Sequence, residues 1–295
     1  KSEFTGSKSK YFGKVCLACR NCEAICPQEA LAFPNYYRVE KGRWSNAALS
    51  IPEKGKGYPN PFMDKNPPLF NEIENKITDI ERVIYRRRSN RVFTDKEVPR
   101  EMVHRILEAG RFSPSAGNAQ PWKFVVVRDR ALLDELSKGC TKTLGMVTRL
   151  YQGKGPLRKL VKNSAAFLRP DGIDQRPMVA IQALLTPQFS EKQMDVFFGA
   201  TTVIYVLVHH MGISTPVFST GMCCQNMVLT AHSLGLGTCY AGFGTEPVNM
   251  SKKLKKKLGV KWPYDHVATS IIVGYPAVQI DKPVEREFPQ VDWIE

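Results

Sequence analysis

Four cysteines stand close together near the start of the sequence, and their spacing has the clearest chemical meaning. Cys16, Cys19, Cys22 and Cys26 follow the pattern C-x2-C-x2-C-x3-C, and Pro27 comes next. In a reducing compartment, thiols clustered in this way bind metal more often than they form disulfides. Zinc sites usually separate two cysteine pairs by about 12–20 residues, whereas here all four thiols lie in one short run. The spacing therefore favours a metal cluster over a zinc ion or plain structural thiols.

The same run resembles the cysteine signature of bacterial ferredoxins. We therefore predict that residues 1–34 form a ferredoxin-type segment in which the four cysteines bind a [4Fe-4S] cluster. In ferredoxins with two clusters, the fourth cysteine of such a run binds the other cluster. Three alternatives stay open: the fourth cysteine closes the same cluster, a second run lies upstream of Lys1, or a remote thiol contributes. The remote thiols, which ordinary core packing also explains, are Cys140, Cys223, Cys224 and Cys239.

A second constellation is the basic run RRRSNRVFTD at residues 86–95. Arg87, Arg88 and Arg91 crowd together at a predicted helix end, with Ser89 between them. Guanidinium groups can hold phosphate oxygens through paired hydrogen bonds, and a hydroxyl adds a further contact. A solvated run of charges is the simpler alternative. Taken alone, the run indicates a phosphate site without establishing it.

Two further segments could bring backbone amides close to a ligand. SPSAGNAQPW at residues 113–122 has the composition of a tight loop, and LGLGTCYAGFG at residues 234–244 is rich in small residues that permit close approach. The second segment does not follow a predicted strand and open a helix, so it is not a dinucleotide-binding fingerprint. The sequence contains neither G-x-G-x-x-G nor a P-loop.

In their order along the chain, these segments closely resemble the nitroreductase family of FMN enzymes. The segments that match are RRRSNR, SPSAGNAQPWKFVVV, GMCCQNMVLTAHSLGLGTCYAGF and IIVGYPA. The resemblance extends from about residue 77 to the end, and the N-terminal cysteines resemble the ferredoxin-fused branch of the family. It implies an α+β fold, an α/β sandwich around a mainly antiparallel sheet, built as an intertwined homodimer with the flavin at its interface.

The resemblance also implies roles for individual residues around the cofactor. The residues expected to hold the FMN phosphate and the pyrimidine edge of the ring are Arg87, Arg88, Ser89 and Arg91. The loop that the partner subunit lays over the isoalloxazine is expected to use Pro114, Ser115, Ala116 and Asn118. The position before the long helix, facing the N5 side of the flavin, corresponds to Ser219, Thr220 and Gly221.

One late basic residue departs from the family pattern. Arg286, in KPVEREF, is expected to return to the phosphate, yet Glu285 and Glu287 flank it where the family often has a second basic residue. No residue is assigned a catalytic role, because the flavin itself performs the redox chemistry and the protein supplies position and electrostatic field.

The resemblance implies an FMN-dependent oxidoreductase. Electrons would enter through the [4Fe-4S] cluster from a ferredoxin-like donor, or come from NAD(P)H. The acceptor would be an electron-poor small molecule such as a nitroaromatic or a quinone. The alternative is a non-catalytic flavin and iron–sulfur redox sensor or electron-transfer module.

Hydrophobic periodicity indicates the elements that must position these residues. It predicts helices over residues 77–84, 99–110 and 221–234, and strands over 123–129, 203–208 and 269–277. Helices that alternate with buried strands favour the α+β or α/β class. Residues 35–75 are expected to form a linker or wrapping segment and 76–295 the FMN domain. The irregular, basic stretch 139–195 is expected to form a lid, with a surface helical insertion as the alternative.

Charge and composition limit the partners. The chain of 295 residues has 42 Lys and Arg against 28 Asp and Glu, a formal charge of +14, and 43% hydrophobic residues. We predict no membrane span, no nucleic-acid partner and a cytoplasmic location, since apolar runs are short and neither a signal core nor a nucleic-acid motif is present. The sequence starts without Met, so the chain is expected to come from a longer gene product. The run SKKLKKKLG at residues 251–259 predicts a short helix with a solvated face, or a patch that binds an acidic partner.

Overall fold

The computed structural model describes residues 4–5, 8–9, 56–64, 68–152, 195–210, 213–280, 282–289 and 291–295. The four clustered cysteines, almost all of the predicted linker before residue 56 and residues 153–194 of the predicted lid lie outside these ranges. The chain divides into two compact units. One unit comprises Gly57–Thr143 and Asp195–Arg286, and the other comprises Lys1–Lys56, Leu144–Met194 and Glu287–Glu295. The sheet and the predicted flavin residues belong to the first of these units.

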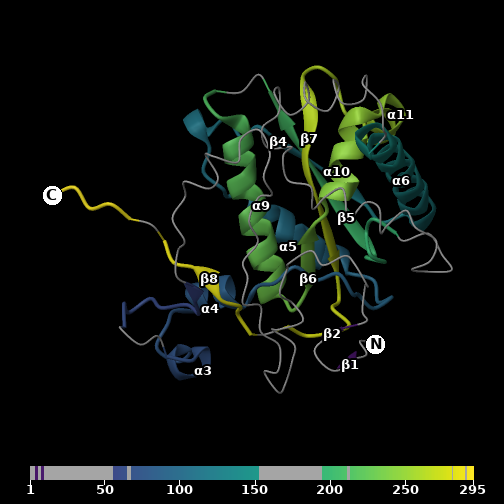
Figure 1. Ribbon diagram of the computed structural model, residues 1–295. Coiled ribbons are helices and arrows are strands. Elements are labelled where there is room, and N and C mark those ends of the chain that lie inside the picture. Colours follow the sequence, from purple (N-terminus) through teal and green to yellow (C-terminus); the bar gives the residue numbers. More distant parts are fainter. Residues whose placement is uncertain are drawn as a thin grey trace. The chain divides into compact units, whose positions relative to one another are not determined.

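A four-stranded antiparallel sheet forms the centre of that unit, in the order β4-β5-β7-β6 (Figure 1). Its strands are β4 (Trp122–Val127), β5 (Thr202–His209), β6 (Gly237–Tyr240) and β7 (Asp265–Gly274). All three ladders are antiparallel, as the sequence predicts for this fold. Strands β4, β5 and β7 lie at or near their predicted positions, whereas β6 falls in the small-residue segment 234–244, for which the sequence analysis predicts no strand.

One face of the sheet is covered by two helices, α5 (Arg100–Arg111) and α9 (Pro216–Ser233) (Figure 1). They pack close together, because a Cβ on Gly110 would lie only 2.8 Å from the Met227 Cγ. The core between these helices and the sheet includes Ile106, Ile204, Val206, Met227, Ile271 and Val273. Strand β5 is buried along nearly its whole length, since its apolar side chains pack on both faces.

The other face of the sheet is covered by α6 (Arg130–Gln152) and α10 (Gly242–Met250), with α11 (Lys252–Lys257) beside them (Figure 1). Tyr205 points to this side from β5, and its ring meets Phe197 edge to face at 6.4 Å. The Thr245 hydroxyl lies 3.0 Å from that of Ser270, which joins α10 to β7. Two helical layers around one sheet give the α+β sandwich that the sequence predicts.

Several short elements complete the described chain. They are β1 (Phe4–Thr5), β2 (Lys8–Ser9), β3 (Lys56–Gly57), α3 (Phe70–Ile73), α4 (Asp79–Arg86), the 3-10 turn η1 (Ala116–Asn118) and β8 (Arg286–Glu287).

Two long helices differ from the sequence-based prediction. Helix α9 begins at Pro216, one and a half turns before the predicted start, because proline suits the first turn of a helix. Helix α6 is not predicted from the sequence, and it includes residues 139–152 of the predicted lid. The role of residues 139–195 as a lid stays a prediction.

Candidate functional site

Helix α4 brings the arginine run to the sheet. Thr78 caps its N-terminus: the Glu81 amide donates to the Thr78 hydroxyl at 3.3 Å, and the Thr78 amide donates to the Glu81 carboxylate at 2.8 Å. At the other end, Arg87 leaves the helix with φ −58° and ψ 126°. The helix therefore ends immediately before the residues that the sequence assigns to a phosphate site.

The segment after α4 attaches to the edge of the sheet. Ser89 bridges Thr238 of β6 in the parallel sense, and the Asn90 amide donates to the Thr238 carbonyl at 2.8 Å. Farther along, the Thr94 amide donates to the Tyr275 carbonyl at 2.9 Å. These contacts fix the backbone on both sides of Arg91, and so fix where the arginines can reach.

Two glycines make room for this segment. Gly237 of β6 and Gly274 of β7 face each other in the ladder. A Cβ on Gly237 would lie 2.9 Å from the Asn90 Cβ, and a Cβ on Gly274 would lie 2.8 Å from the Phe93 ring. Any larger residue at these positions would push the segment off the sheet. These glycines therefore allow residues 89–94, which follow the arginines, to pack against the sheet.

The three consecutive arginines have different environments. Arg86 forms an ion pair with Glu74, and Arg87 is partly buried. Arg88 is only 6% exposed. The alternative interpretation, a solvated run of charges, is therefore wrong for this segment.

The surroundings of Arg87 shift the pKa of its guanidinium. Burial lowers its pKa, and the nearby Arg286 guanidinium lowers it further, whereas Tyr240 and Cys239 act in the opposite sense. Among the residues that the structure describes, no carboxylate forms an ion pair with Arg87 or Arg286. Two neighbouring cations, one of them partly buried, create a place where an anion such as a phosphate would be stabilised.

The predicted loop over the flavin has a shape that it maintains by its own hydrogen bonds. Gly117, Asn118 and Gln120 have φ of +57°, +52° and +46°, which is unusual for the two that are not glycine. The Ser115 hydroxyl accepts from the Gln120 amide at 3.0 Å, and the Ser115 carbonyl accepts from the Asn118 amide at 3.0 Å. Pro114 and Asn118 are exposed at its surface. Such strained, exposed turns are typical of functional loops.

The residues expected before the long helix lie inside it. Ser219 and Thr220 are 3% and 0% exposed within α9, and the Thr220 hydroxyl donates to the Pro216 carbonyl at 2.8 Å. Gly221 alone of the three has an exposed surface. The predicted position of Ser219 and Thr220 before the helix is therefore wrong. The role of the three residues beside a flavin stays a prediction, and Gly221 is the one that is exposed.

The described contacts form two groups. One joins the arginine segment to β6 and to Arg286. The other joins the loop to the region before α9, since a Cβ on Gly117 would lie 3.1 Å from Ile213. Large apolar side chains are exposed around the second group, among them Phe112 at 72% and Phe218 at 65%. An apolar surface of this kind usually becomes covered by another molecule.

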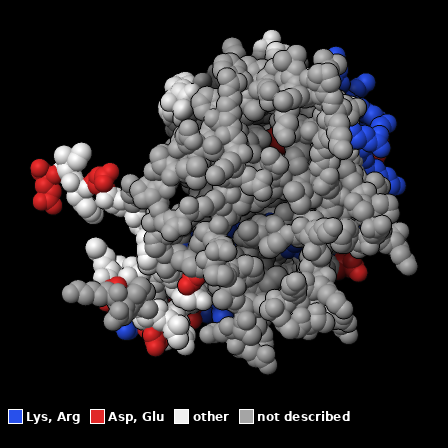
Figure 2. Space-filling view, in the orientation of Figure 1, with Lys and Arg blue, Asp and Glu red and all other residues white. Residues whose placement is uncertain are grey.

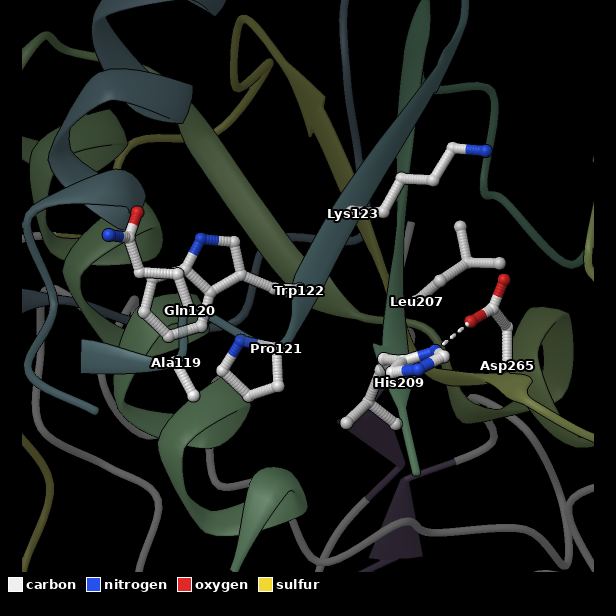
Figure 3. A pocket seen from close by; sticks show the side chains of 9 residues that line it. Ala119, Gln120, Pro121, Trp122, Lys123, Leu207, His209 and Asp265 are labelled. Carbon is white, nitrogen blue, oxygen red and sulfur yellow. Dashed lines mark hydrogen bonds and ion pairs between the residues drawn. The ribbon is translucent and has the colours of Figure 1, made fainter. Parts of the chain in front are cut away.

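A pocket that the sequence does not predict lies next to the loop, between the ends of β4, β5 and β7. It has a volume of about 320 Å³, and Gln120, Pro121 and Trp122 form one side of it (Figure 3). On the other side the His209 Nδ1 lies 2.8 Å from the Asp265 carboxylate. The adjacent histidines His209 and His210 are the sequence feature next to this pocket.

The remote cysteines are core residues. Cys140, Cys223, Cys224 and Cys239 are buried in the core of the described structure. Burial raises the pKa of Cys140, Cys223 and Cys224 to about 12, as expected for thiols packed in a core. Among the described residues, no group of three or more His, Cys, Asp or Glu could hold a metal ion. The four predicted cluster ligands lie outside those ranges, and their role stays a prediction.

The family pattern described as "Nitroreductase family" matches residues 84–275, which is more than half of the chain. The chain belongs to the nitroreductase family. It is an oxidoreductase of that family, as the sequence predicted. Within the ranges given above, no helix is long and apolar enough to cross a membrane.

Nitroreductase relatives match parts or most of the chain. A protein from Archaeoglobus fulgidus, provisionally named NADH dehydrogenase/NAD(P)H nitroreductase, is 28% identical over 201 residues, which is 68% of this chain and 87% of the relative. A protein with the same provisional name from Methanothermobacter thermautotrophicus is 41% identical over 66 residues, which is 22% of this chain and 35% of the relative.

Solved nitroreductase structures share the fold. The FMN-bound nitroreductase from Bacteroides fragilis has a TM-score of 0.53 at 19% identity, covering 74% of this chain and 100% of that one. The FMN-bound nitroreductase from Desulfitobacterium hafniense has a TM-score of 0.52 at 20% identity, with the same coverage. At this level of identity the likeness establishes the nitroreductase fold of the chain.

Proposed function

We propose that this nitroreductase-family chain binds FMN and reduces an electron-poor organic acceptor, such as a nitroaromatic or a quinone. The observation that carries the proposal is the pair of neighbouring guanidinium groups, Arg87 and Arg286, without a carboxylate partner among the described residues. A phosphate between them would supply the missing negative charge. The FMN in the structures of similar fold supports the same cofactor.

The chain's own residues would bind and orient the cofactor. Arg87, Arg88, Ser89 and Arg91 would hold the phosphate and one edge of the ring, with Arg286 closing the phosphate site. When bound, FMN supplies hydride and single-electron chemistry. Guanidinium groups near the ring stabilise the negative charge that reduction adds, and so favour reduction.

A homodimer would complete the site. Pro114, Ser115, Ala116 and Asn118 of one protomer would cover the flavin held by its partner, and Gly221 would approach the N5 side. The exposed apolar side chains beside the loop support this arrangement, because an interface would cover them. Light scattering should then give twice the mass of one chain, and a monomer that retains FMN would contradict the arrangement.

Two routes could deliver electrons. The names of the relatives support NAD(P)H as a donor. We also propose that Cys16, Cys19, Cys22 and Cys26 hold a [4Fe-4S] cluster that passes single electrons from a ferredoxin-like donor, on the strength of their spacing. The cytoplasmic location and the absence of a nucleic-acid partner stay predictions.

The test is purification without oxygen, followed by measurement of flavin, iron and sulfide per chain. We expect one FMN and about four irons for a single cluster. A Cys19→Ser variant should lose iron and keep FMN, while an Arg87→Ala variant should lose FMN and keep iron. A chain that retains no flavin would overturn the proposal, and one that retains iron after the cysteine change would overturn the assignment of the cluster.

Turnover separates the enzyme from a sensor. With NADH, NADPH or reduced ferredoxin as donor, a nitroaromatic and a benzoquinone should be reduced at rates that require bound FMN. Bound FMN with negligible turnover for every donor and acceptor would instead favour the redox-sensor alternative.

A further inference from the structure

The lysine-rich helix α11 forms a basic surface that the flavin chemistry does not use. Its Lys252, Lys253, Lys256 and Lys257 are exposed, and Lys261 follows just after the helix. Figure 2 shows the basic side chains gathered over this part of the molecule. We call the surface formed by α11 and residues 261–264 the α11 face.

The α11 face is held rigidly by the fold. The Ser251 hydroxyl accepts from the Leu254 amide at 3.4 Å and caps the helix. Leu254 is buried against α6, where a Cβ on Gly139 would lie 2.8 Å from it. Because the two leucines of the helix, Leu254 and Leu258, face inward, the lysines must face outward. The last turn contains Lys255–Lys257, where the helix dipole favours positive charge.

Nearby carboxylates reduce this charge only in part. Glu135 of α6 lies 2.7 Å from the Lys257 ammonium and 3.7 Å from that of Lys253. Glu246 on α10 is also exposed, and Asp265 pairs with His209. No acidic side chain is recorded in an ion pair with Lys252, Lys256 or Lys261 among the described residues. The face therefore keeps a net positive charge directed at solvent.

Two aromatic side chains project beside the lysines. Trp262 is 66% exposed and Tyr264 is 55% exposed. The Lys255 ammonium lies 4.6 Å from the centre of the Trp262 ring, and the Asp265 amide donates to the Lys261 carbonyl at 2.8 Å to close the turn. An exposed tryptophan and tyrosine next to a cluster of lysines match the lipid headgroup region, where such rings partition and where anionic lipids attract the charge.

The residue types distinguish a membrane from a protein partner. Protein interfaces are enriched in arginine and depleted in lysine at their centres. Every cation of α11 is a lysine, a strongly hydrated point charge that suits a diffuse anionic surface better than bidentate recognition. We propose that the α11 face binds peripherally to anionic phospholipid membranes, with its lysines near the headgroups and Trp262 inserted among them.

The test uses the full chain loaded with FMN and measures its co-sedimentation with vesicles. We expect binding to phosphatidylcholine vesicles that contain about 30% phosphatidylglycerol, little binding to phosphatidylcholine alone, and loss of binding as salt rises. The double variant Lys252→Glu/Lys256→Glu should weaken partitioning roughly tenfold or more, because each lysine near the surface contributes independently. Trp262→Ala should weaken it several-fold and leave the salt dependence in place.

A matched control removes the effect of net charge. Lys76→Glu/Arg105→Glu makes the same change in charge at exposed positions away from the α11 face, and it should bind vesicles nearly as the unaltered chain does. Flavin content and circular dichroism show that each variant is folded. Equal loss of binding in the control and the α11 variant would overturn the proposal. Binding to duplex DNA or to an acidic polypeptide through the same lysines, without vesicle binding, would also overturn it in favour of those partners.

Discussion

Two basic segments of the chain look alike in sequence and differ in structure. Residues 86–91 follow a helix, leave it at Arg87 and join the edge of the sheet, and Arg88 is almost completely buried. Lys252–Lys257 form a helix that points its charges at water and pairs two of them with Glu135. The arginines of the first segment are therefore partly desolvated and fixed in position, whereas the lysines of the second segment stay hydrated.

The difference shows what distinguishes a ligand site from a charged surface. A partly buried guanidinium such as that of Arg87, which has no carboxylate partner among the described residues, is costly unless a ligand supplies the counter-charge. An exposed, hydrated lysine needs no ion-pair partner. A cluster of such lysines acts on charged molecules through its electrostatic field. Burial and the position of carboxylates separate the two cases, and a count of basic residues does not.

The largest expected effect comes from removing the partly buried cation. Arg87→Ala should weaken FMN binding by about 2–5 kcal/mol, that is, roughly 30-fold or more, because a charged hydrogen-bonding group is lost from a desolvated site. Arg87→Lys should recover only part of this loss, since lysine lacks the planar fork. Fluorescence titration of the apoprotein measures the affinity. The exposed Arg105→Ala is the control, and equal affinities for Arg87→Ala and the control would remove the contrast between the two segments.

The next effect concerns the glycine that seats the arginine segment. Gly237→Ala should destabilise the fold by about 1–3 kcal/mol through overpacking against Asn90 and should also weaken FMN binding. Urea unfolding and FMN titration measure the two quantities. Gly242→Ala, where a Cβ would meet nothing within 4 Å, is the control for stability. An unchanged FMN affinity in folded Gly237→Ala would show that the packing of the arginine segment against Gly237 does not affect FMN binding.

A smaller effect comes from His266, which follows the pocket residue Asp265 in the chain. Burial lowers the pKa of His266, the neighbouring His210 lowers it further, and Asp265 opposes both. The folded chain therefore binds fewer protons at this ring than the unfolded chain does. The stability contribution is fully present above the ordinary pKa of 6.5 and is lost as pH falls from there towards the lowered value.

Urea unfolding at about pH 7.5 and about pH 5.5 measures this contribution. In His266→Gln the free energy of unfolding should change less between the two conditions than in the unaltered chain. The exposed His104→Gln serves as the control. An identical pH dependence in His266→Gln and the unaltered chain would show that the buried ring does not contribute.

The smallest expected effect is on stability at the α11 face. Glu135→Gln should leave the unfolding midpoint nearly unchanged, because surface ion pairs contribute little. The same change should strengthen binding to anionic vesicles, since it frees Lys253 and Lys257. A drop of many degrees in the midpoint would mean that the lysines of α11 serve structure instead of the surface field.

Local sequence patterns predicted α5, most of α9 and three of the four sheet strands, but not the longest helix, α6 (Arg130–Gln152). Strand β5 was predictable from its apolar run, because both of its faces are buried. Strand β6 was not, since its four residues include a glycine and become a strand only by pairing with β7 on one side and Ser89 on the other. The early start of α9 and the whole of α6 were also missed.

The candidate site was predictable in its parts. Arg87 and Arg286 lie near each other in the structure, as the order of the motifs implied. Ser219 and Thr220 match by motif but lie buried in α9, because the helix begins a turn and a half earlier than expected. The close packing of Asn90 on Gly237 and of Phe93 on Gly274 could not be predicted from the sequence, because it depends on tertiary contacts.

The central strand also has a consequence for how the chain reaches its folded state. β5 pairs with β4, which ends at Val127, and with β7, which starts at Asp265, so both neighbours are distant in sequence. Forming such contacts requires closing long loops, which slows folding. Until β7 has been synthesised, the apolar run of β5 has only one possible strand neighbour in the sheet. Nascent or refolding chains at high concentration should therefore aggregate through this strand, and dilution should improve their recovery.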